Sequence, residues 1–161
     1  YAADAVDFAL AYHRALAALP VPLTARAGLH VGPVILRENA AADVALGAKP
    51  LEVDGIAKPT AARVMAIAHG GQLLLTTEAA ESLGKTMLRV RSHGHWLMKG
   101  LTEPIELFEV NAHDAAFVAP AGGDKARRVV QSAGRWVAVD ELPNNLPQLA
   151  TSFIGREREL A

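Results

Sequence analysis

The chain has 161 residues, of which 51% are hydrophobic and 20% charged, a balance typical of one globular domain with an appendage. Its 16 Lys and Arg residues nearly cancel its 17 Asp and Glu residues, so no overall field favours nucleic acid or anionic lipid. No cysteines are present, which excludes disulfides and thiolate metal sites and is typical of a cytoplasmic protein. No apolar run approaches the roughly 20 residues of a membrane-spanning helix.

Residues 2–19 predict an amphipathic helix that Pro20 and Pro22 end. We expect its core face to consist of Ala5, Phe8, Ala9, Tyr12, Leu16 and Leu19. From Leu23 the apolar residues alternate with polar or small ones, which predicts a strand over 23–31 that residues 34–36 extend.

Residues 38–55 are small and polar, so they predict a long excursion, with one helical turn at 41–46. A helix is expected over 56–69, because Pro59 lies near its start and two glycines follow its end.

The next segments predict a short buried strand at 72–75, a short helix at 76–83 and two strands at 87–96 and 105–110. Strands and helices therefore interleave, which favours a sheet covered by helices. After Asn111 the composition shifts to Ala, Pro and Gly, so we expect a linker with a small β element over 113–148.

Several motifs follow one another in a distinctive order. They are Gly28-Leu-His-Val-Gly-Pro-Val34 after a helix, then Gly55 with Ala61-Ala-Arg63, Gly70-Gly71-Gln72 and Lys99-Gly100-Leu101. Over residues 1–112 this set resembles the class III adenylate and guanylate cyclases. The resemblance implies an α+β fold, a ferredoxin-like βαββαβ sheet covered by helices, truncated at its N-terminus. It also implies a homodimer whose two catalytic units face each other head to tail.

The resemblance further implies an enzyme that converts ATP to 3′,5′-cyclic AMP and pyrophosphate for intracellular signalling. The ribose 3′-oxygen attacks the α-phosphate, so the site must stabilise added negative charge and hold two Mg²⁺ or Mn²⁺ ions. In the family two aspartates, from segments before the first helix of this chain, hold these ions. Because the chain opens at Tyr1 within a helical pattern, we expect those segments to precede it and the fragment alone to be inactive.

Arg63 falls on the family's arginine that stabilises the transition state, and its fork of donors suits a pentavalent phosphorus. The alternative is an ordinary solvated or ion-paired helix arginine. Pro59 stands where the family has an asparagine, and a proline side chain cannot hydrogen-bond the ribose. Lys99 falls in a turn where family members often carry a lysine that contacts phosphate; otherwise it is a solvated turn lysine.

Glu52 lies near the family position whose acidic side chain receives the adenine amino group, and Asp54 is its rival because the local spacing is one residue short. A carboxylate only accepts hydrogen bonds, so it favours adenine over guanine and ATP over GTP. Either side chain could instead be a plain loop charge.

Other polar residues carry weaker hypotheses. His30 is interpreted as an interface or hydrogen-bonded histidine, and His93 with His95 could form a metal pair but lack a third ligand. The cluster at 125–128 is interpreted as a wetted surface that is too small to bind nucleic acid.

Residues 149–161 end in Gly155-Arg-Glu-Arg-Glu-Leu160 and resemble the lead-in to a P-loop ATPase domain of the AAA or STAND type. The resemblance implies a regulatory ATPase domain as the C-terminal partner in the parent chain. A degenerate cyclase-like module that binds nucleotide or a partner and regulates that ATPase is the alternative function, and a scaffold without a nucleotide site is the third. Two aspartates before Tyr1 would favour the enzyme.

Overall fold

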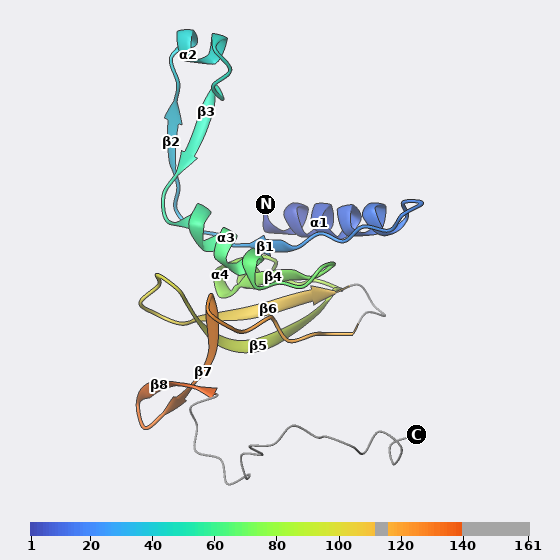
Figure 1. Cartoon of the computed structure of the whole chain (residues 1–161), viewed down its shortest axis with the longest axis vertical. Helices are drawn as coiled ribbons and strands as arrows, with labels where there is room; N and C mark the ends of the chain where they lie inside the picture. Colours follow the sequence, from blue (N-terminus) through green and yellow to red (C-terminus); the bar gives the residue numbers. More distant parts are fainter. Residues whose placement is uncertain (112–115, 140–161) are drawn as a thin grey trace, which may run out of the picture.

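The computed structural model describes residues 1–111 and 116–139. Its centre is a six-stranded sheet (Figure 1). In spatial order the strands are β1 (Ala27–Leu29), β4 (Leu73–Thr76), β6 (Ile105–Asn111), β5 (Arg89–Met98), β7 (Ala126–Ser132) and β8 (Arg135–Ala138). The pair β1–β4 is parallel and the other pairs are antiparallel.

Helices cover both faces of the first strands of this sheet. The helix α1 (Ala2–Ala17) and the short α4 (Thr77–Glu81) share one apolar cluster with β4, and α3 (Ala57–Ala66) shares the other. Side chains along β4 alternate between the two clusters, with Leu73 and Leu75 in one and Leu74 in the other. Since every residue of β4 is buried, this strand forms the centre of the core. The prediction of an α+β fold is confirmed.

The predicted core face of α1 is wrong at Phe8, Tyr12 and Leu19. Val6 and Leu10 are the buried residues of this helix, whereas Phe8 and Tyr12 are 72% and 48% exposed and stack on each other with ring centroids 6.1 Å apart. Ala9 packs beside the buried pair. Small alanine side chains let the helix come close to the sheet, while two aromatic rings would hold it away, so the aliphatic stripe faces inward.

The predicted strand at the N-terminal side of the sheet is also shorter than expected. β1 has three residues, and Gly32-Pro33 separates it from β2 (Ile35–Glu38), because proline has no N–H for a sheet ladder. β2 pairs instead with β3 (Leu51–Asp54), and the resulting β2–β3 hairpin projects from the sheet (Figure 1). At its tip lies α2 (Ala41–Ala45), so the helical turn predicted within the excursion is confirmed.

The helix α3 lies directly against β1 because a glycine leaves room for it. A Cβ added at Gly28 would be 2.4 Å from the backbone N of Met65 and 2.8 Å from the carbonyl O of Ala61. No side chain fits between these two backbones, so Gly28 fixes how closely α3, which carries Arg63, approaches the sheet.

A buried polar network joins the middle strands to the segment that follows them. The carboxylate of Glu109 accepts hydrogen bonds from His93 Nε2 (2.6 Å), Gln72 Nε2 (2.9 Å), Asn111 Nδ2 (2.9 Å) and the backbone N–H of Val118 (3.2 Å). Glu109 is 2% exposed, so this carboxylate depends on its donors for all of its solvation.

The segment 116–121 is thereby held against the core, and it also contacts the end of α3. The N–H of Ala121 donates to the carbonyl O of Ile67 at 2.8 Å, and His69 Nε2 lies 2.9 Å from the carbonyl O of Ala119. The chain then enters β7, which pairs with the edge of β5 that β6 leaves open.

The small β element expected in 113–148 is therefore the β7–β8 hairpin, and it belongs to the same sheet. The boundaries at 112 and 148 stay predictions, and the ATPase-like segment 149–161 lies outside the described residues. Within the described part of the chain, no helix has the length and apolar character that crossing a bilayer requires.

Candidate functional site

Arg63 lies in the last turn of α3 and extends to the turn between β5 and β6. Its Nη2 is close to Gly100, where an added Cβ would be 3.2 Å from it. Its Nη1 is buried and has no hydrogen-bond partner among the described residues. A buried guanidinium nitrogen without a partner is costly, and an anion is the natural partner for it.

Lys99 belongs to the same turn, so the structure brings Arg63 close to the backbone that carries Lys99. The turn is closed by the Leu101 N–H, which donates to the carbonyl O of Met98 at 3.0 Å, and Gly100 has a φ of 78° that favours glycine. The Lys99 side chain is exposed and lines an open cavity of about 430 Å³ together with Gly100.

The two candidate acidic residues lie apart from this turn, on the β2–β3 hairpin. Arg37 Nη2 donates to Glu52 Oε2, and Arg37 Nε lies 3.7 Å from Asp54 Oδ2. The strand register explains this arrangement, because Arg37 is directly opposite Glu52 in the ladder. Both carboxylates therefore share one guanidinium, and neither is an isolated loop charge.

These contacts change the protonation equilibria of the hairpin. The hydrogen bond from Arg37 is the main reason that the pKa of Glu52 lies below its usual value, and Asn39 and Lys58 lower it further. The same hydrogen bond raises the pKa of Arg37. Glu52 is therefore an ionised acceptor at neutral pH.

Glu52 also lines an open hollow of about 510 Å³ with Lys58, in the first turn of α3. Lys58 and Arg63 are five residues apart, or about 7.5 Å along a helix axis. Glu52 and Arg63 thus lie near opposite ends of α3. Pro59 is in the first turn of this helix, where its missing N–H costs nothing, and its side chain offers no hydrogen bond.

Arg37 and Lys125 were missed as individual site residues by the sequence analysis. Cross-strand pairing in a hairpin rich in alternating charge could have indicated Arg37. Lys125 was placed only within a charge cluster, although the N–H of Lys99 donates to its carbonyl O at 2.9 Å. The sequence alone does not reveal this contact, because it depends on the pairing of β7 with β5.

His30 is hydrogen-bonded within the fold, as the sequence indicates. Its Nδ1 lies 2.9 Å from Thr76 Oγ1 and 3.5 Å from Glu78 Oε2. Burial alone would raise the pKa of Glu78, but hydrogen bonds from Thr76 and its own N–H, with the nearby His30, lower it overall. His30 thus joins β1 to the start of α4.

The two histidines of β5 do not converge. His93 is buried on Glu109, whereas the ring of His95 lies 4.7 Å from that of Trp136 on β8. The register shifts between Ser92 and His95, and Gly94 has a φ of 75°, so the simple alternation that would place both rings on one face is broken.

In residues 1–111 and 116–139, no three His, Asp or Glu side chains gather as a metal site requires. The described residues therefore do not by themselves form the two-ion centre that the cyclase resemblance implies.

Comparison with solved structures finds nucleotide cyclases. The adenylyl cyclase CyaB from P. aeruginosa matches with a TM-score of 0.58 and 21% identity, over 70% of this chain and 59% of that one. The catalytic core of a rhodopsin-guanylyl cyclase with converted specificity, in complex with ATPαS, matches with a TM-score of 0.57 and 19% identity, over 69% of this chain and 57% of that one. An adenylate cyclase from Trypanosoma brucei, in its monomeric state, matches with a TM-score of 0.51 and 22% identity, over 71% of this chain and 56% of that one.

No protein-family model matches the sequence, and no curated protein matches it significantly. The chain spans between 56% and 59% of the length of the three cyclase chains above. At these identities the likeness concerns the fold, and it agrees with the predicted βαββαβ class. About 70% of the chain therefore shares its fold with part of the class III nucleotide cyclase catalytic domains.

Proposed function

We propose that this chain is the later part of an adenylate cyclase catalytic domain that converts ATP to 3′,5′-cyclic AMP and pyrophosphate, and that it acts as a homodimer. One observation carries the proposal: Arg63, with a buried and unpartnered Nη1, lies against the turn that holds Lys99. Two cations on a fold shared with nucleotide cyclases suit a triphosphate.

Arg63 is the residue that stabilises the reacting phosphate in this proposal. During cyclisation the oxygens around the α-phosphorus gain negative charge, and a preorganised guanidinium stabilises that charge without rearranging. Because Nη1 has no hydrogen-bond partner among the described residues, a phosphate oxygen that reaches it would break no existing hydrogen bond within the protein. Lys99, exposed in the turn that Arg63 approaches, contacts the leaving pyrophosphate.

Glu52 is the proposed adenine reader, with Asp54 as its rival. A carboxylate has about four lone-pair sites, so Glu52 can accept a hydrogen bond from the adenine amine while Arg37 still donates to it. The position of Glu52 near the start of α3 and of Arg63 near its end is consistent with a base and a phosphate chain placed along this helix.

The remaining parts of this proposal lie outside the described residues. The Mg²⁺ or Mn²⁺ ions would be held by residues beyond those described and would supply Lewis-acid activation. A regulatory ATPase domain would follow this chain in the parent protein, which we expect to be cytoplasmic.

A second function is favoured by Pro59. Its side chain cannot hydrogen-bond a ribose from the first turn of α3, so the substrate could lack the orientation that cyclisation needs. In that case the domain binds a nucleotide or a partner without catalysis and regulates the attached ATPase.

The test is cyclic AMP and cyclic GMP production by the full-length protein with Mn²⁺ and either ATP or GTP. We expect cyclic AMP from ATP, and a fall in turnover of about 100- to 1,000-fold for Arg63→Ala. Arg14→Ala, which removes an exposed arginine from the last turn of α1, is the matched control and should leave turnover unchanged.

Unchanged turnover in Arg63→Ala would refute the assigned role of this residue. If the folded dimer binds a metal–ATP analogue but releases no cyclic nucleotide, the regulatory module is the correct function.

A further inference from the structure

Three cationic residues lie at the end of the β5–β7 ladder. The last pair of this ladder is Met98 with Ala126, and Lys99 and Lys125 lie in the turns directly beyond that pair. The N–H of Lys99 donates to the carbonyl O of Lys125, which joins the two turns. Arg127 lies on β7, opposite Leu97.

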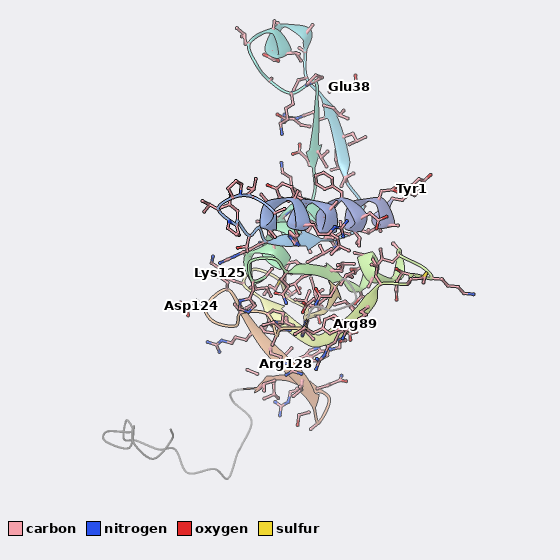
Figure 2. All side chains as sticks on the ribbon, turned by 90° about the vertical axis from the view of Figure 1, so that its right-hand side faces the viewer. Tyr1, Glu38, Arg89, Asp124, Lys125 and Arg128 are labelled. Atoms are coloured by element: carbon pink, nitrogen blue, oxygen red, sulfur yellow. The ribbon has the colours of Figure 1, made fainter. Side chains whose placement is uncertain are left out.

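Lys99, Lys125 and Arg127 line the same open cavity, of about 430 Å³. Asp124 is the one carboxylate in that lining, so cationic side chains outnumber acidic ones there even without Arg127, although the whole chain carries a formal net charge of −1. Figure 2 shows Asp124 and Lys125 beside each other, at the far end of the sheet from Arg89.

Like charges on two adjoining turns repel each other. Lys99 and Lys125 are both exposed, so a dissolved anion can reach them. An anion bound between them turns the repulsion into two attractive contacts, and a chain of phosphates is the anion whose several charges suit this spacing. Gly100, which Arg63 Nη2 approaches, lines the same cavity.

We propose that Lys125 and Arg127, on the hairpin that follows the cyclase-like segment, form with Lys99 a binding subsite for the triphosphate of the nucleotide. This inference rests on the proposed function for the identity of the ligand. It adds a contribution from residues beyond 112, so that the β7–β8 hairpin takes part in substrate binding.

The experiment measures the binding of inorganic tripolyphosphate to the full-length protein by isothermal titration calorimetry, together with the KM for ATP. Lys125→Ala should weaken tripolyphosphate binding about tenfold, the loss of one charge-assisted contact, and raise the KM by a similar factor while kcat changes less than twofold. Lys125→Arg should restore most of the tripolyphosphate affinity and most of the wild-type KM. Arg135→Ala, at the tip of the same hairpin and outside the cavity, is the charge-matched control.

The outcomes separate this subsite from the proposed function. Tripolyphosphate binding that depends on Lys125 in a protein that makes no cyclic nucleotide would support the subsite and refute the catalytic function. Cyclic AMP production with a KM and a tripolyphosphate affinity that are the same in Lys125→Ala and Arg135→Ala would refute the subsite alone. If ATP and tripolyphosphate bind at the same time without competition, the assignment to the substrate's triphosphate is wrong.

Discussion

Replacing Glu109 by alanine should destabilise the fold more than any surface substitution. Four donors point at this carboxylate, but Gln72 and Asn111 keep second acceptors in the carbonyl O atoms of Val118 and Ala116. His93 Nε2 and the N–H of Val118 would be left without a hydrogen-bond acceptor. At about 1–3 kcal/mol for each stranded buried donor, the expected loss is about 2–6 kcal/mol, against a typical total of about 5–15 kcal/mol.

Equilibrium urea unfolding, followed by far-UV circular dichroism, measures this loss. Glu109→Gln should cost less than Glu109→Ala, about 1–2 kcal/mol, because its carbonyl O still offers an acceptor at the position of Oε2, although its amide N–H₂ then faces the Asn111 donor. Glu106→Ala, on the same strand but bonded only to Ser92 at an exposed site, is the control and should cost less than about 1 kcal/mol. Equal losses for Glu109→Ala and Glu106→Ala would refute the reasoning.

Two further predictions test the packing of the helices. Gly28→Ala must push α3 away from β1 and should cost about 1–3 kcal/mol in the same assay, whereas Gly122→Ala, whose nearest neighbouring atom is 3.8 Å away, should stay within about 0.5 kcal/mol. Burial lowers the pKa of His13 below its usual 6.5, so the unfolded state binds more protons and stability falls as the pH drops below 6.5. The melting temperature should therefore decrease more steeply with falling pH in the wild type than in His13→Gln, and equal slopes would contradict this.

The sequence predicts most elements of the sheet because each carries a local signal. The short apolar run Leu73–Leu75 is a buried strand, as predicted. The helix expected over 56–69 is shorter, because α3 already ends at Ala66, before the two glycines at 70–71. No local signal of this kind decides which face of α1 is buried. Phe8 with Tyr12 and Val6 with Leu10 have the same spacing, and the choice between them depends on how closely the helix approaches the sheet.

The sequence predicted single residues of the candidate site, but it did not predict the contacts between them. Arg63 and Lys99 come from the motif order, but the pairing of Glu52 with Arg37 depends on the register between β2 and β3. A period-two pattern alone does not show which partner strand each half will find, because register is set by tertiary pairing.

The segment after residue 112 has the largest consequence for the site. Composition indicates a linker there, yet residues 116–121 bond to Glu109 and to the end of α3, and β7 continues the sheet beyond β5. The same stretch of chain thus contacts the end of the helix that carries Arg63 and joins Lys125 to Lys99 by a backbone hydrogen bond. Displacing the β7–β8 hairpin from β5 would separate Lys125 from Lys99, so under our proposal a domain that follows this hairpin would act on the phosphate subsite through it.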